Sequence, residues 1–260
     1  MLADANGCPA LSADDATKRK TRMLVEPFKL NPFNSQYDGA YSPESMEWRR
    51  TTALDKARNI NEMIKGRNIG SVLEVGCGTG SVLAALKRFG IGTSHTGIDL
   101  SDPADHLDPG ARDFDIRKYD GNEVPFPNQS FDLVVATHVI EHVPNPRGIL
   151  RELRRVSRNF VYVEVPCEHK IYSSRRTMQD SVSTGHINAY TPEHFLILLQ
   201  TSEMNVVDLR LFDHSLEVQA LGSSRLKGRV RQIIRGTALR IHPLMASRIF
   251  CYHCGALAAV

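Results

Sequence analysis

The sequence predicts an α/β fold, a doubly wound, Rossmann-like sheet of seven strands that is mostly parallel and has an antiparallel terminal strand. Short apolar runs alternate with segments whose apolar residues recur at helical spacing, which is typical of this class. The apolar run at 71–75 breaks into glycines before a helical pattern begins at Ser81. The chain has 260 residues, enough for one such domain with a large core.

Each expected element follows from its local pattern. A helix is expected from Pro43 to about residue 64, and further helices at 81–89, from Pro146 to 156, and after the hydroxyl cap and proline of Thr191-Pro192. The run at 131–136 is continuously apolar after its aspartate, which is typical of a central parallel strand. The other expected strands are 71–75, 94–99, 114–117, 160–165 and 206–212, and the antiparallel strand is expected from Ile249 to Val260.

A glycine-rich loop predicts a nucleotide-like cofactor. Glycines permit positive φ and close approach of a ligand to the backbone, and the helix that follows offers unpaired N–H groups. The loop reads G-x-G-x-G from Gly76 to Gly80, with Glu74 two residues before it. This spacing differs from the G-x-G-x-x-G of dinucleotide-binding folds and disfavours a nicotinamide cofactor.

With Asp99 after the second strand and an acid after the third, residues 54–213 resemble the class I S-adenosylmethionine-dependent methyltransferases, in particular the small-molecule O-methyltransferase (type 11) branch. The resemblance implies that Asp99 accepts from the ribose hydroxyls and Asp120 from the adenine amine, although Asp120 before Gly121 also suits a simple turn. The residues implied for cofactor binding are Glu74, Gly76, Cys77, Gly78, Gly80, Asp99, Leu100, Asp120, Gly121 and Thr137.

The segment after the fourth strand carries the expected chemistry. Ubiquinone-pathway and small-RNA 2′-O-methyltransferases, which this segment resembles, have an acid-x-x-Glu-His metal motif, and here His138 replaces the first acid before Glu141 and His142. The pattern from His186 to Phe195 resembles a further histidine motif of the small-RNA enzymes. The resemblance implies a metal site at His138, Glu141, His142 and His186. Replacing an acid by histidine shifts the preference from magnesium toward zinc, manganese or iron.

A metal-free alternative stays open, because a histidine here can itself act as general base. His142 is the first candidate for activating the acceptor, and His186 and His138 follow. The expected reaction is O-methylation of a hydroxyl on a sugar or glycosylated small molecule, in which a divalent ion stabilises an alkoxide. An RNA 3′-terminal ribose, a phenol or catechol, and a non-catalytic cofactor-binding module remain alternatives.

Charge at the C-terminal end points to a phosphate-bearing partner. No acid follows Glu217, whereas arginines and a lysine accumulate from Arg225 to Arg240, so a basic helical insertion is expected around 222–245. The expected partners are a phosphate- or lipid-linked glycan or an anionic membrane surface, with RNA less favoured; the competing interpretation is a solvated helix. No run reaches the ~20 apolar residues of a membrane span.

The N-terminal residues 1–42 are expected to form a flexible arm and lid, with 43–260 as the methyltransferase domain. Tyr37, Tyr41 and Trp48 either line the acceptor pocket or pack on the sheet. The chain begins without a signal-peptide pattern, and its five cysteines predict a reduced, cytoplasmic protein, peripheral to the membrane if the basic segment binds there. Cys251 and Cys254 have the C-x-x-C spacing of half a zinc site, but no second ligand pair has this spacing. The favoured interpretation is therefore that the two cysteines are buried packing residues.

Overall fold

The structure is a computed structural model that describes residues 28–29, 42–102 and 106–260. All of its helices and strands described below belong to the unit Asn31–Val260, whereas only Phe28 and Lys29 are described in the unit Met1–Leu30. Most of the expected arm, including Tyr37 and Tyr41, therefore lies outside the described residues. Trp48 is described and is 49% exposed on helix α2 (Pro43–Met63).

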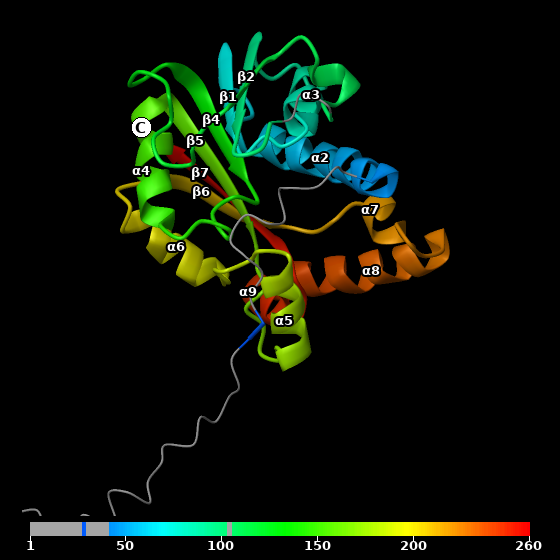
Figure 1. The fold of residues 1–260 in the computed structure, drawn as a ribbon. Helices are drawn as coiled ribbons and strands as arrows, with labels where there is room; N and C mark the ends of the chain where they lie inside the picture. Colours follow the sequence, from blue (N-terminus) through cyan, green and yellow to red (C-terminus); the bar gives the residue numbers. More distant parts are fainter. Residues whose placement is uncertain (1–27, 30–41, 103–105) are drawn as a thin grey trace, which may run out of the picture. The chain divides into compact units, whose positions relative to one another are not determined.

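A seven-stranded sheet with the order β3-β2-β1-β4-β5-β7-β6 organises the domain (Figure 1). β7 is antiparallel to both of its neighbours, and the other printed pairings are parallel, which confirms the predicted fold class. The strands are β1 (Ser71–Val75), β2 (Ser94–Asp99), β3 (Asp115–Lys118), β4 (Phe131–Thr137), β5 (Ser157–Pro166), β6 (Asn205–Phe212) and β7 (His253–Ala259).

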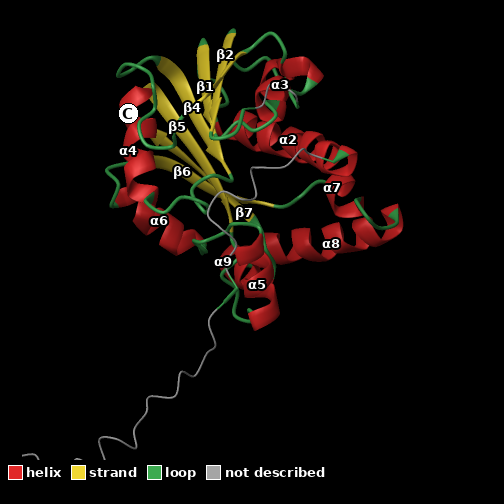
Figure 2. Cartoon of the chain, viewed as in Figure 1, coloured by secondary structure: helices red, strands yellow, loops and turns green. Residues whose placement is uncertain are grey.

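Helices cover both faces of this sheet (Figure 2). Helix α2 packs on α3 (Ser81–Arg88) over one face, and α4 (Pro146–Val156) lies with α6 (Pro192–Gln200) over the other. Two hydrophobic cores result, because alternate residues of the central strands point to opposite faces: Val134 joins the core under α4, and Leu133 joins the core under α2. Burial on both faces explains why these strands have continuous apolar sequences.

The remaining described helices follow β5 and β6 in the sequence. They are α5 (Arg175–Ser183), α7 (Leu216–Ala220), α8 (Arg225–Ile241) and α9 (Pro243–Ile249), and a short 3-10 turn spans Pro109–Ala111. α8 occupies most of the segment expected to be a basic helical insertion.

Two element boundaries differ from the expected ones for identifiable reasons. The last strand begins at His253 rather than near Ile249, because Pro243 starts helix α9, whose cap His242 accepts a hydrogen bond from Met245 N at 3.2 Å. β5 begins at Ser157, directly after α4 ends, and its first residues pair with β4 at Phe131. The expected cap at Thr191 is present, since its hydroxyl accepts from His194 N at 3.2 Å.

Candidate functional site

The candidate site lies where the order of parallel strands reverses between β1 and β4. Ligands of open α/β sheets bind beyond the carboxyl ends of the strands at such a switch point. Polar side chains gather at these ends: Glu74 on β1, Asp99 on β2, Thr137 on β4 and Glu164 on β5, all less than 9% exposed. Buried carboxylates at an otherwise apolar sheet edge are costly without partners, which marks this edge for binding.

The glycine loop after β1 is held by the end of β2. Gly76 N donates to Ile98 O at 2.8 Å, and Gly78 N donates to Asp99 Oδ2 at 2.7 Å. The other carboxylate oxygen, Oδ1, accepts from the backbone N and the hydroxyl of Ser101 at 3.0 and 2.8 Å. Asp99 therefore fixes the conformation of the glycine loop.

Alanine at Gly76 is expected to destabilise the fold more than alanine at Gly66. Both glycines have φ near +75° (74° and 79°), so both substitutions carry the left-handed strain of about 1–2 kcal/mol. A Cβ at Gly76 would also lie 2.5 Å from Val139 Cγ2, whereas one at Gly66 meets nothing within 4 Å. We expect about 2–4 kcal/mol lost for Gly76→Ala by urea unfolding. Equal losses in the two variants would contradict this close packing.

Glu74 is a buried acid with an unsatisfied oxygen. It is 1% exposed, and its Oε2 has no hydrogen-bond partner among the described residues. Burial raises its pKa to about 8, against the opposing charge of Lys56 on α2. Burial also lowers the pKa of Lys56, although the charges of Glu164, Glu74 and Glu141 act in the opposite direction. A cationic ligand beside Glu74 would satisfy this oxygen.

Four more of the residues expected to bind the cofactor are Leu100, Gly121, Asp120 and Cys77, and their contacts differ. Gly121 lies against Leu100, since a Cβ at Gly121 would be 2.7 Å from Leu100 Cδ2. The exposed Asp120 accepts from Asn122 N at 2.9 Å, a turn contact that fits the competing interpretation of this residue. Cys77 belongs to the core under α2, and its sulfur packs where a Gly97 Cβ would lie, so only its backbone is available to a ligand at the loop.

Three of the four residues expected to bind a metal form one cluster. Glu141, His142 and His186 each offer a ligand atom within 4.8 Å of the others, although His142 and His186 are far apart in sequence. The two imidazole rings lie 4.7 Å apart, and their Nδ1 atoms are hydrogen bonded to Gly185 O at 3.1 Å and to Glu168 Oε2 at 2.9 Å respectively. Such bonds orient imidazoles as ligands or bases.

Glu141 is the unusual member of this cluster. It is fully buried, and in the described part of the chain neither of its carboxylate oxygens accepts a hydrogen bond. Burial raises the pKa of Glu141 and lowers that of His142. Burial opposes charging of His186 as well, but the hydrogen bond and charge of Glu168 outweigh it, so the pKa of His186 is raised. The donor set of two nitrogens and one carboxylate fits a divalent ion.

His138, the fourth expected ligand, lies between Glu141 and a second group. Its Nδ1 is 3.3 Å from Glu141 Oε1, while its Nε2 is 3.4 Å from His253 Nδ1 and 3.8 Å from Glu164 Oε1. Neither Glu164 nor His253 was predicted from the sequence. A glutamate inside the apolar run of β5 was the available signal, because such a residue has to find a buried partner.

Of the two C-terminal cysteines, Cys254 is buried, as the packing interpretation predicts, and Cys251 is partly exposed. Cys254 is fully buried in the core that also contains Cys167. Among residues 28–29, 42–102 and 106–260, neither group with metal-ligand geometry includes a cysteine.

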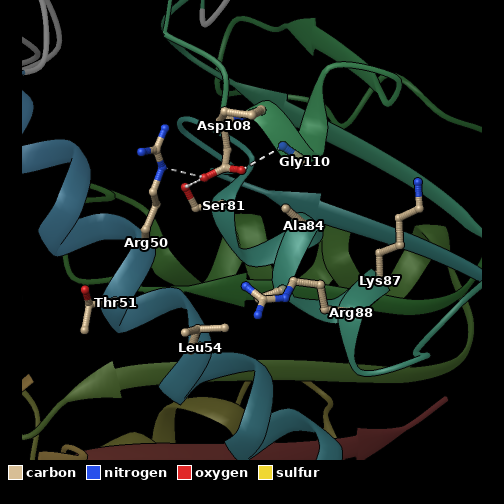
Figure 3. Close-up of a pocket in the computed structure, with 11 residues that line it drawn as sticks. Arg50, Thr51, Leu54, Ser81, Ala84, Lys87, Arg88, Asp108 and Gly110 are labelled. Atoms are coloured by element: carbon tan, nitrogen blue, oxygen red, sulfur yellow. Dashed lines mark hydrogen bonds and ion pairs between the residues drawn. The ribbon is translucent and has the colours of Figure 1, made fainter. Parts of the chain in front are cut away.

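A separate cleft of about 520 Å³ lies between α2 and α3 (Figure 3). Asp108 lies in its wall and accepts from Arg50 Nε at 3.0 Å, from the Ser81 hydroxyl at 3.2 Å and from Gly110 N at 2.9 Å. None of the residues expected to bind the cofactor lines it. This cleft is therefore not the expected cofactor site.

Within the described ranges, no helix combines the length and apolar character that a bilayer span requires.

Curated relatives match about half of the chain. A ubiquinone biosynthesis O-methyltransferase of Nitrosomonas europaea is 29% identical over 143 residues, covering 51% of this chain and 58% of the relative. A phosphatidylethanolamine N-methyltransferase of Cereibacter sphaeroides is 32% identical over 132 residues, covering 47% and 58%. The matched segments thus span little more than half of these relatives' lengths.

Solved structures share the fold at low identity. A geranyl diphosphate C-methyltransferase from Streptomyces coelicolor, in complex with Mg²⁺, geranyl diphosphate and S-adenosyl-L-homocysteine, aligns with a TM-score of 0.58 at 13% identity, covering 90% of this chain and 89% of that one. A SAM-dependent methyltransferase from Archaeoglobus fulgidus aligns at 0.56 and 20%, covering 81% and 94%.

One family model matches the segment that contains the glycine loop and the acids at the carboxyl edge of the sheet. The model describes a methyltransferase domain and matches residues 47–209, more than half of the chain. The chain therefore belongs to the methyltransferase domain family.

Proposed function

We propose that the protein is an S-adenosylmethionine-dependent O-methyltransferase acting on a hydroxyl of a sugar or glycosylated small molecule, assisted by a divalent ion. The observation that carries this is Glu141, a fully buried carboxylate without a hydrogen bond beside His142 and His186, just beyond the end of β4. Family membership supports the methyl donor, and the relative named for ubiquinone biosynthesis supports an oxygen acceptor.

The loop and its neighbouring acids fit the methyl donor. A Cβ at Gly76 would lie 2.5 Å from Val139 Cγ2, and both Gly76 and Gly78 have positive φ, so the loop favours glycine; the orphaned oxygen of Glu74 suits a cationic ligand. The bound donor supplies a methyl group on a sulfonium. During transfer the C–S bond of the donor would break, with S-adenosylhomocysteine as the leaving group, and a C–O bond would form to the acceptor. The hydroxyl proton would pass to solvent from an ion-bound acceptor or, where no ion is bound, to an imidazole, for which His142 is the first candidate.

Glu141, His142 and His186 would hold the divalent ion, with His138 next to Glu141. An ion here would stabilise an alkoxide at neutral pH and favour acceptors that offer two adjacent hydroxyls. Two imidazoles with one carboxylate favour zinc, manganese or iron over magnesium. The chain's own contribution is to orient the rings through Gly185 O and Glu168, and to bury the carboxylate.

The proposal is tested with protein purified without a histidine tag, a labelled methyl donor and a cell-extract acceptor pool. We expect labelled product and S-adenosylhomocysteine, loss of product after glycosidase treatment of the pool, and loss of turnover in excess chelator that added zinc or manganese restores. Full turnover in chelator would leave the metal-free histidine base. If ribonuclease destroys the acceptor, the acceptor is RNA and not a sugar. If no pool gives product, the protein is a cofactor-binding module without methyltransferase activity.

Binding of the methyl donor is expected to release a proton at pH 7. With its pKa at about 8, Glu74 holds a proton in the free protein, and a bound sulfonium and ammonium favour its ionised form. Up to about one proton per donor should be released, and affinity should rise as pH approaches 8. Calorimetry in two buffers of different ionisation enthalpy measures the proton count. Glu74→Gln should abolish the release, whereas Glu47→Gln on the exposed side of α2 should retain it.

The same raised pKa sets a stability trend for the free protein. An unfolded glutamate loses its proton near pH 4.5, so the stabilisation from protonated Glu74 is complete below that pH and is lost as pH rises toward 8.

We also propose that helix α8 docks on an anionic membrane surface and brings the protein to a lipid-linked acceptor. Its outward residues are apolar at helical spacing, with Leu226 74%, Ile233 60% and Ile241 77% exposed, and Val230 and Ile234 exposed between them. The helix has no acid, and its exposed cations Arg225, Lys227, Arg229, Arg231 and Arg240 have no ion-pair partner in the described part of the chain. An apolar stripe bordered by cations is the composition of helices that lie in the bilayer interface.

Packing on the opposite face of α8 fixes this orientation. Arg235 points inward, donating to Asp213 Oδ1 at 2.7 Å and to Cys251 O at 2.6 Å, and Tyr252 donates to Arg235 O at 2.7 Å. Gly228 is buried against Ala220, where a Cβ would come within 3.1 Å of the backbone. The apolar stripe therefore faces away from the domain.

A further inference from the structure

A second metal-ligand group lies on the far side of His138 from Glu141. His138 follows β4, Glu164 lies near the end of β5, and His253 begins β7. The strands β4, β5 and β7 are neighbours in the sheet, and their registers pair Thr137 with Glu164 and Pro166 with His253. Three segments distant in sequence thus present two imidazoles and a carboxylate at one sheet edge.

The three ligand atoms lie close enough together to bind one ion. His253 Nδ1 is 3.2 Å from Glu164 Oε1, His138 Nε2 is 3.4 Å from His253 Nδ1, and His138 Nε2 is 3.8 Å from Glu164 Oε1. A point equidistant from three atoms so spaced lies about 2.0 Å from each, which matches metal bonds to histidine nitrogen and carboxylate oxygen of about 2.0–2.2 Å.

Outer contacts hold Glu164 in place, and a carboxylate lies beside the outer nitrogen of His138. Tyr162 OH and Asn59 Nδ2 donate to Glu164 Oε2 at 2.5 and 2.9 Å, which leaves Oε1 for the histidines. His138 Nδ1 lies 3.3 Å from Glu141 Oε1, so the nitrogen that faces away from the group has its own carboxylate. The pair forms no hydrogen bond in the described structure, but a carboxylate this close to the second imidazole nitrogen is the kind of neighbour that orients histidine ligands of metals.

The backbone conformation of His138 and the buried negative charge also favour a bound cation. His138 has φ +58°, an uncommon conformation for a residue other than glycine, and its N–H donates to Glu164 O at 2.9 Å. Glu164 and Glu141 are both fully buried, and Lys56, whose charge acts on both, has no nitrogen within 4.0 Å of either carboxylate. A cation would offset this buried negative charge.

We propose that His138 Nε2, His253 Nδ1 and Glu164 Oε1 bind a transition-metal ion of the zinc, iron or manganese class, distinct from an ion at Glu141, His142 and His186. The ion joins the ends of β4, β5 and β7 and fixes the ring of His138 at the mouth of the candidate site. Its role is structural and orienting, and it does not depend on which acceptor is methylated.

Metal counting separates the two groups. Untagged protein is stripped with chelator, titrated with Zn²⁺ by calorimetry and measured for bound zinc after gel filtration. We expect two equivalents in the wild type, one in His253→Asn, one in His186→Asn, and none in the double variant. His194→Asn, a histidine outside both groups, should keep two. Affinity at the remaining site in His253→Asn should change less than tenfold.

Outcomes decide the two metal proposals independently. Wild-type zinc content in a folded His253→Asn variant would overturn the inference. One equivalent that is lost in His253→Asn but kept in His186→Asn would support it while removing the acceptor-bound ion. If His253→Asn fails to fold, diffraction from zinc-loaded wild-type crystals at the zinc absorption edge decides: an anomalous peak between the three ligand atoms supports the inference, and its absence overturns it.

Discussion

Replacing His142 with asparagine is expected to lower methyl transfer by about 100-fold or more, because the residue either takes the acceptor proton or binds the ion that activates it. Affinity for S-adenosylhomocysteine should stay within about twofold, since Gly76, Gly78 and Asp99 form a separate part of the sheet edge. Single-turnover formation of labelled product measures the first quantity, and calorimetry measures the second.

The matched control is His194→Asn, which removes an imidazole near His169 and outside both metal-ligand groups. A loss of turnover equal to that of the control would show that His142 only packs in the pocket. His186→Asn ranks second, because His186 shares the cluster and is bonded to Glu168. A loss of donor affinity in His142→Asn would instead mean that the histidine belongs to the cofactor site.

The sequence alone predicted where those residues of the candidate site lie that are local in the chain. Glu74, the loop at 76–80 and Asp99 each follow directly from a strand end, and a strand end in a parallel sheet has a fixed place relative to its neighbours. The hydrogen bond from Gly78 N to Asp99 Oδ2 joins two such neighbouring strand ends. The fold class was predictable for the same reason, because double burial produces the continuous apolar runs of β1 and β4.

Long-range partners were not predictable from spacing. Glu164 and His253 meet only because β7 inserts between β5 and β6, and nothing in the local sequence fixes that position. His186 was found through a resemblance, whereas His253 follows no such pattern. Arg235 shows the same limit: in the sequence it is one cation among many on α8, and the structure turns it inward to Asp213.

Exchanging both Ile233 and Ile234 for serine is expected to abolish binding of the protein to anionic vesicles. Full burial of an isoleucine contributes about 1.5–3 kcal/mol, so loss of two should weaken binding by about 100-fold or more. The fold should be kept, because both side chains are exposed. Co-sedimentation with vesicles of phosphatidylglycerol and phosphatidylcholine measures the effect, and Ile197→Ser on the exposed side of α6 is the matched control.

Charge reversal tests the other half of the same surface. Each basic residue near an anionic surface contributes about 1 kcal/mol, so Arg229→Glu with Arg231→Glu should weaken binding by at least about 30-fold, and added salt should reduce the wild-type affinity. Binding of the wild type to neutral vesicles should be much weaker. If the wild type binds no vesicles and instead forms a dimer that Ile233→Ser dissociates, α8 contacts a second copy of the chain, and the membrane proposal is wrong.

Because Arg235 faces Asp213 and not the apolar stripe, Arg235→Gln should lower the stability of the fold rather than weaken vesicle binding through its charge. This difference separates the inward arginine from the outward ones.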